Sequence, residues 1–276
     1  MFEYKLHIDE FLNYCRYHKK LSDKTIRAYK IDLSQYGVFS NELSKQALWD
    51  YIEYLNKKYK PKTAKRKLAT LKAFIHFLLL QDLIDFNPFD KLETTIKEPL
   101  LLPKTIPLGV IAKLISFSYQ QIVFAKSDYQ IRSAVRNTAI LELLFATGAR
   151  VAEICTLRSD NVDLLGNSVK FYGKGSKERI IPIENFAVLS ILRKYHSLFE
   201  KEIPDSGYFF VNKLGRRMTE QSVRNMINFY CKQCGVDMHI TPHMFRHSFA
   251  TLLLEEDVDI LSLIHISEPT RPISIS

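Results

Sequence analysis

The chain has 276 residues, of which 46% are hydrophobic, so it can bury a sizeable core and is not a disordered polypeptide. Its net charge of +9 favours a polyanionic partner, with nucleic acid before an acidic membrane surface. No apolar run is long enough to cross a bilayer and the N-terminus lacks the apolar stretch of a signal peptide, so we expect a cytoplasmic protein with free cysteine thiols.

Apolar residues recur at helical spacing in four successive segments of the first 80 residues. We expect helices at 5–19, 23–36, 45–55 and 62–80. Ser22 and Ser44 stand just before the second and third helices and suit N-caps, because a serine hydroxyl can accept a hydrogen bond from a free backbone N–H. Together the four helices are typical of one small bundle.

Basic side chains gather on this bundle, at the start of the fourth helix and on one face of the second. Those that we expect to contact nucleic acid are Arg27, Lys30, Lys62, Lys65 and Arg66. One interpretation is a surface that follows a phosphate backbone. The alternative is an ordinary solvated face, which is what most runs of charge turn out to be.

Residues 87–107 contain four prolines and lose the helical period. We therefore expect an interdomain linker at 95–107, between a domain at 1–94 and a second domain that begins near residue 108. In the second domain we expect helices, a loop at 160–163, a β-hairpin at 168–183 and a short buried segment at 208–211. The helices are expected at 108–117, 128–146, 150–157, 185–200 and 219–234, with a last one from residue 242.

Three local signals mark the ends of these helices. Gly148 suits a left-handed turn at a helix C-terminus. Thr241 can cap the last helix, and Pro242 fits its first position because the missing N–H is unused there. Cys231 and Cys234 form a CxxC pair, but no second pair stands at zinc-finger spacing, so we interpret them as two thiols on a helix.

Four groups suited to a phosphate stand on separate elements of the second domain, namely Arg150, Lys174, His243 and Arg246. His243 and Arg246 are one helical turn apart beside a helix N-terminus, which favours anions. Two guanidiniums can clamp non-bridging oxygens and stabilise a pentacoordinate transition state. Lys174 can protonate a leaving 5′-oxygen, and His243 can donate to the phosphate or move a proton. The alternative for this last helix is a capped basic helix with a solvated edge.

The same composition argues against metal-assisted hydrolysis. No carboxylate cluster is available to hold Mg²⁺, and we expect no metal ion and no cofactor. A route without metal needs a nucleophile supplied by the protein.

Glu153 is one turn from Arg150 and could hold it by an ion pair.

Three stretches, at 146–154, 173–179 and 242–251, resemble the tyrosine recombinase (phage integrase) family and within it the bacterial Xer-type recombinases. The resemblance implies a mainly α fold with a small antiparallel β-hairpin or sheet. It implies an N-terminal four-helix, SAM-like core-binding domain at 1–94 and an α+β catalytic domain at 108–266, closed as a clamp around duplex DNA. The family's catalytic arginine, lysine and His-x-x-Arg pair fall on the four residues named above.

The implied activity is site-specific recombination: cleavage and religation of double-stranded DNA through a 3′-phosphotyrosine, without cofactor. It implies a tetramer on paired sites, formed by this chain alone or with a paralogous recombinase, and no membrane. The family places its tyrosine after the His-x-x-Arg helix, whereas the last tyrosine here is Tyr230. Residues 267–276 contain two prolines and no helical period, and we expect a non-native tail on a truncated recombinase.

Two other functions compete with this interpretation. The first is a cleavage-defective DNA-binding protein of the same fold, which the missing tyrosine favours. The second is an RNA-binding or membrane-surface protein, which explains the positive charge but not the four-residue set.

Overall fold

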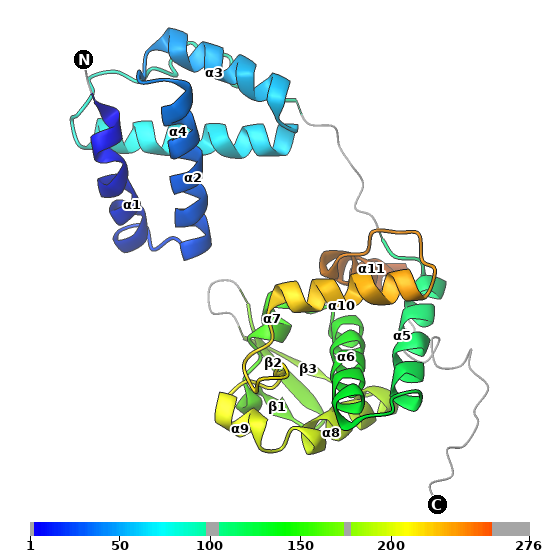
Figure 1. Cartoon of the computed structure of the whole chain (residues 1–276). Coiled ribbons are helices and arrows are strands. Elements are labelled where there is room, and N and C mark those ends of the chain that lie inside the picture. The colour runs from blue at the N-terminus through cyan, green and yellow to red at the C-terminus, as the bar shows by residue number, and fades with distance from the viewer. Residues whose placement is uncertain (1–2, 98–104, 174–177, 256–276) are drawn as a thin grey trace, which may run out of the picture. The chain divides into compact units, whose positions relative to one another are not determined.

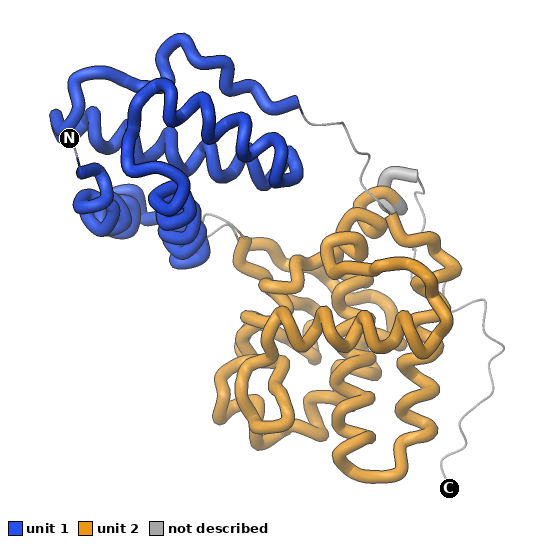
Figure 2. Tube along the Cα trace, turned by 45° about the horizontal axis from the view of Figure 1, so that its top comes forward, with its two compact units in different colours: residues 1–101 blue, residues 102–276 orange. Residues whose placement is uncertain are grey.

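The computed structural model describes residues 3–97, 105–173 and 178–255 (Figure 1). The chain divides into two compact units, residues 1–101 and 102–276 (Figure 2). This division falls inside the expected linker at 95–107, but 98–104 lie outside the described residues, so the linker and the domain limits on either side of it remain predictions. The tail at 267–276 also lies outside them.

The first unit is a helical bundle whose core is rich in aromatic rings, including those of Tyr4, Phe11 and Phe74. Its elements are η1 (Tyr4–His7), α1 (Ile8–Tyr17), α2 (Asp23–Phe39), α3 (Lys45–Lys58) and α4 (Pro61–Leu80). The two expected caps are confirmed: Ser22 accepts a hydrogen bond from the backbone N–H of Thr25, and Ser44 accepts one from that of Ala47.

The second unit packs helices around a small sheet. Its helices are α5 (Leu108–Val123), α6 (Asp128–Thr147), α7 (Val151–Cys155), η2 (Ser159–Asn161), α8 (Phe186–Leu198), α9 (Glu202–Ser206), α10 (Glu220–Gln233) and α11 (Pro242–Glu255). The strands are β1 (Val162–Asp163), β2 (Ser168–Tyr172) and β3 (Glu178–Pro182), in the order β1-β2-β3. The hairpin is confirmed, with Val169 of β2 opposite Ile181 of β3 in antiparallel register. The expectation of a loop at 160–163 is wrong at its end, because β1 pairs with β2 there.

Helix α6 is the centre of this unit, flanked by α5 and α8 (Figure 1). Every residue from 138 to 145 is buried, so the helix presents no solvated face over this stretch. A reciprocal pair of hydrogen bonds between Ser127 and Gln130 caps its start, and Gly148 ends it with φ of +54°. The burial of α6 fixes the position of the segment that follows Gly148.

The observed fold confirms the mainly helical class with one small antiparallel sheet. Helix α5 extends to Val123, past the expected end at residue 117, and α9 was not expected at all. With five residues and Ile203 as its buried side chain, α9 is too short to show a helical period. Over the described ranges, no helix is long and apolar enough to span a membrane.

Candidate active site

The turn between α6 and α7 brings Arg150 next to helix α11. A Cβ added at Gly148 would lie 2.3 Å from Cδ1 of Phe249 on α11. Both this close approach and the positive φ therefore require a glycine at this position. The Arg246 guanidinium, also on α11, donates a hydrogen bond from Nη1 to the carbonyl oxygen of Gly148 at 2.7 Å. The two expected arginines therefore belong to segments that contact each other.

The carboxylate of Glu153 on α7 is the hub of this region. It accepts hydrogen bonds from the backbone N–H of Arg150 at 2.8 Å and from Nη1 of Arg150 at 2.9 Å, which confirms the expected ion pair. Arg179 on β3 donates to both oxygens, from Nη1 at 3.1 Å and Nη2 at 2.6 Å. Burial opposes ionisation, but the hydrogen bonds from Arg179 and Arg150 outweigh it and lower the pKa of Glu153 to about 2.

Positive charge dominates around this hub. Burial lowers the pKa of the Arg246 guanidinium, and so do the nearby charges of Arg150 and Arg179, while Glu153 opposes them. Arg150 keeps 45% of its side-chain surface and Arg179 keeps 31%, so both guanidiniums can reach a ligand while Glu153 holds them. This arrangement of donors on a partly buried surface suits a phosphodiester.

Of the other two expected residues, His243 lies within the described residues and Lys174 does not. His243 is exposed on the first turn of α11, one turn before Arg246. Lys174 lies outside the described residues, because 174–177 at the hairpin tip are not described, and its approach to the arginines remains a prediction. Arg179 was missed as a site residue. Arg179 belongs to the stretch 173–179 that carries part of the family resemblance. The neighbouring sequence, however, holds no signal that an arginine on a strand will pair with a distant carboxylate.

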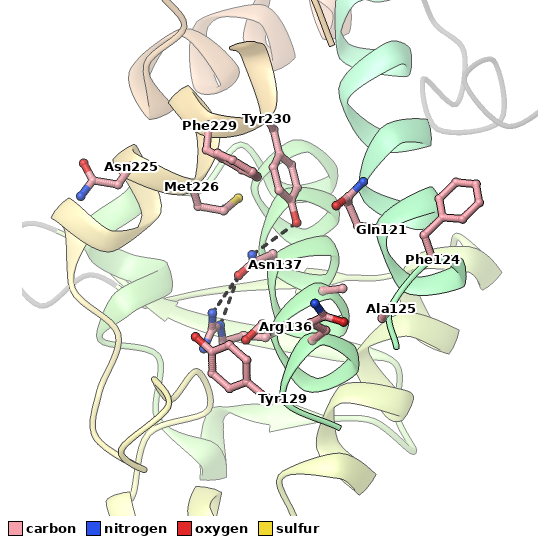
Figure 3. Close-up of a pocket in the computed structure, with 13 residues that line it drawn as sticks. Gln121, Phe124, Ala125, Tyr129, Arg136, Asn137, Asn225, Met226, Phe229 and Tyr230 are labelled. Atoms are coloured by element: carbon pink, nitrogen blue, oxygen red, sulfur yellow. Dashed lines mark hydrogen bonds between the residues drawn. The ribbon is translucent and has the colours of Figure 1, made fainter. Parts of the chain in front are cut away.

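Tyr230, the last tyrosine of the sequence, lies on α10 and is 3% exposed. Its hydroxyl accepts a hydrogen bond from Nδ2 of Asn137 at 3.3 Å, and the ring points toward α6 there (Figure 3). Burial raises the pKa of its phenol. These contacts show that Tyr230 packs its ring and hydroxyl against α6. Neither its burial nor its raised pKa favours a role as nucleophile.

The basic residues expected to bind DNA lie on α2 and α4. Arg27, Lys30, Lys62, Lys65 and Arg66 are all exposed. Arg66 also donates a hydrogen bond to the buried carboxylate of Asp32 on α2. Lys67, in the same charge run, is only 3% exposed and donates to Asp32 at 3.0 Å. The run therefore contains a buried ion pair beneath its exposed cations.

Comparisons with known proteins give matches that cover most of the chain. Residues 114–267 match the model of the phage integrase family, and residues 8–82 match that of the phage integrase N-terminal SAM-like domain. A tyrosine recombinase of Agathobacter rectalis is 48% identical over 262 residues, which cover 92% of this chain and 85% of that protein. The tyrosine recombinase XerD of Oceanobacillus iheyensis is 33% identical over 275 residues, covering 94% and 88%.

Two solved structures share the fold. A XerH site-specific recombinase bound to a palindromic difH substrate gives a TM-score of 0.71 at 18% identity, covering 94% of this chain and 76% of that one. A lambda integrase tetramer bound to a Holliday junction gives 0.69 at 14% identity, covering 92% and 74%. The family match and the sequence identities together show that the chain belongs to the phage integrase family of tyrosine recombinases.

Proposed function

We propose that this chain acts at a specific duplex DNA site, where Arg150, Arg246 and His243 hold one phosphodiester. The observation that carries the proposal is the hub at Glu153, which fixes Arg150 and Arg179 on a surface shared with Arg246. Such fixed guanidiniums stabilise the charge that develops on the non-bridging oxygens during attack on phosphorus. Glu153 and Arg179 act as positioning residues, because they orient Arg150.

In the proposed reaction a tyrosine oxygen attacks phosphorus and forms a 3′-phosphotyrosine, while the bond to the 5′-oxygen breaks. Lys174 gives its proton to that leaving 5′-oxygen, and religation runs the same steps in reverse with a 5′-hydroxyl of the partner strand. His243 donates a hydrogen bond to the phosphate throughout. We also propose a tetramer on paired sites. The tetrameric assembly of lambda integrase on a Holliday junction supports this.

The alternative is DNA binding without cleavage, and one observation favours it. Tyr230 is buried against Asn137. We therefore expect the duplex to bind without forming a covalent adduct at Tyr230. An adduct that maps to Tyr230 would contradict this expectation.

A nicked suicide substrate separates the two functions on a denaturing gel. The chain is compared with a fusion that carries the C-terminal segment of the tyrosine recombinase of Agathobacter rectalis. An adduct with the fusion, and its loss in the fusion carrying Arg150→Lys, would support the proposed site. Lysine keeps the charge but loses the bidentate geometry of arginine. If the Arg150→Lys fusion formed the adduct at the parent rate, Arg150 would not hold the reacting phosphate.

The helical bundle of the first unit is proposed to contact the phosphates of the DNA backbone. The residues proposed to do so are Arg27, Lys30, Lys62, Lys65 and Arg66. Each phosphate contact releases about one counterion, so Lys62→Ala and Lys65→Ala should each lower the slope of log K against log salt by about 1. Lys57→Ala is the matched control, since Lys57 lies on α3 and pairs with Glu53 there. Unchanged slopes in both test variants would make the charge run an ordinary solvated face.

A further inference from the structure

A hollow of about 470 Å³ opens between α5, α6 and α10, and none of the residues of the hub at Glu153 lines it (Figure 3). Thirteen residues line it, among them Phe124 at the end of α5, Tyr129 and Arg136 on α6, and Met226 and Phe229 on α10. Arg136 is the one charged side chain of this lining. Nothing in the proposed reaction uses this hollow.

Apolar rings around the hollow are unusually exposed. Phe124 keeps 70% of its surface, Tyr129 keeps 60% and Phe229 keeps 52%. Single exposed apolar residues are common, but several gathered at the rim of one hollow mark an interaction surface. The combination of Phe, Tyr, Met and Arg is also the one enriched at the cores of protein–protein interfaces.

Arg136 in this lining donates its hydrogen bonds to an uncharged neighbour. Its Nε and Nη2 both donate to Oδ1 of the adjacent Asn137, at 3.2 and 3.0 Å, and no carboxylate contacts it within the part of the chain that the structure describes. Arg132, one turn earlier on the same helix, pairs with Glu202. Burial lowers the pKa of the Arg136 guanidinium, while the nearby Tyr195, Tyr129 and Tyr230 oppose this shift. A partly buried cation of this kind is stabilised when an anion with matching geometry binds to it.

We propose that this hollow is a docking site for a segment of a partner protein that presents an aspartate or glutamate next to an apolar side chain. The carboxylate binds Arg136, and the apolar side chain packs between Phe124 and Phe229. A nucleic acid backbone fits less well, because surfaces that follow phosphates carry several cations, whereas Arg136 is the one charged side chain among the apolar and uncharged polar residues of this lining. The proposal does not depend on the recombination chemistry.

The test uses two short peptides on the full chain, followed by NMR of the Met226 methyl group, whose signal is assigned with Met226→Leu. The probes are the acetylated and amidated tripeptides Phe-Glu-Leu and Phe-Gln-Leu, which differ only in the carboxylate. We expect the Glu peptide to shift the Met226 signal and to bind about tenfold more tightly than the Gln peptide, the difference between a charged and a neutral hydrogen bond. In Arg136→Gln the two peptides should bind equally weakly.

The control is Arg193→Gln on α8, where the arginine contacts Leu164 and Asn167 instead, and it should keep the preference for the Glu peptide. Thermal unfolding of each variant checks that it is folded. Equal binding of the two peptides to the parent chain, or no shift with either, would overturn the proposal. A weakened affinity of Arg136→Gln for duplex DNA, with a lower salt slope, would overturn it too and make Arg136 a phosphate contact.

Discussion

Arg179 on β3 donates two hydrogen bonds to the carboxylate of Glu153 on α7, although 26 positions separate the two residues. This contact joins the sheet to α7, the helix whose N-cap residue is Arg150. Because the same carboxylate also accepts from the backbone and side chain of Arg150, the guanidinium of Arg150 is held from its own helix and, through Glu153, from the sheet. Such support is what a site needs if its cations are to be in place before the substrate arrives.

Replacing this carboxylate by Glu153→Gln should destabilise the fold in a pH-dependent way. The pKa falls from 4.5 in the unfolded chain to about 2 in the folded one. The ionised carboxylate therefore adds stability above pH 4.5, and this contribution is lost as pH falls through 2. The pKa difference of 2.5 sets a limit of about 3 kcal/mol, which solvent around the two arginines reduces to roughly 1–3 kcal/mol. Urea unfolding at pH 7 and at pH 3 measures the difference.

Glu178→Gln is the matched control, since Glu178 precedes Arg179 on β3 and forms an exposed ion pair with Lys170. It should change stability little at either pH. A penalty for Glu153→Gln that is the same at both pH values would show that packing, not ionisation, accounts for the effect.

Gly148→Ala should unfold the second unit more easily, by roughly 2–4 kcal/mol, because it adds a clash with Phe249 to an unfavourable positive φ. Gly235→Ala has a similar φ of +62° but nothing within 4 Å of the new Cβ, so it should cost only about 1 kcal/mol. The double variant Gly148→Ala, Phe249→Leu should recover the part of the lost stability that comes from the clash with Phe249. Equal penalties for the two alanine variants would remove the steric argument.

Local signals explain why most of the fold could be predicted from the sequence. Ser22, Ser44 and Gly148 act within a few residues of their helix ends, so their roles can be recognised without tertiary structure. The pairing of β1 with β2 and the contact of Arg179 with Glu153 depend on segments brought together by the core, and no spacing rule predicts them. Arg150 and Arg246 were predicted from their motifs, and the pairing of Arg150 with Glu153 from its spacing, whereas the contact of Arg179 with the same carboxylate needed the structure.

A second buried carboxylate should respond to pH in the opposite direction. Burial raises the pKa of Glu142 on α6 to about 7, although the hydroxyl of Tyr119 donates to it at 2.9 Å and opposes the shift. A folded pKa above the unfolded 4.5 means that the protonated form adds stability below pH 4.5 and that this contribution is lost as pH rises through 7. Glu142→Gln should therefore unfold like the parent chain at pH 4 and be more stable by about 1–3 kcal/mol at pH 8.

Thermal unfolding at pH 4 and pH 8 measures this effect. Tyr119→Phe removes a hydrogen bond that lowers the pKa of Glu142, so its own loss of stability between the two pH values should be steeper than that of the parent chain. If Glu142→Gln were destabilised at pH 8, the carboxylate would be ionised and compensated in the folded chain.

The linker that we propose at 95–107 should be sensitive to protease. Its prolines interrupt the helical pattern, and the division of the chain into two compact units falls within it. Limited digestion with a nonspecific protease should cut there first and leave a stable fragment that begins near residue 105. Early cleavage inside α6 instead would contradict the proposed boundary.

The buried pair of Asp32 and Lys67 predicts an asymmetry between two substitutions in the first unit. Asp32 also accepts hydrogen bonds from Arg66 and Thr70, so Asp32→Asn leaves the buried ammonium of Lys67 without its counter-charge and should cost about 3–5 kcal/mol. Lys67→Met leaves Asp32 with its two other donors and should cost less. The double variant should recover part of the loss, because an apolar side chain then replaces the uncompensated charge. Urea unfolding of the four chains gives the coupling energy, and a value near zero would show that the two residues stabilise the bundle independently.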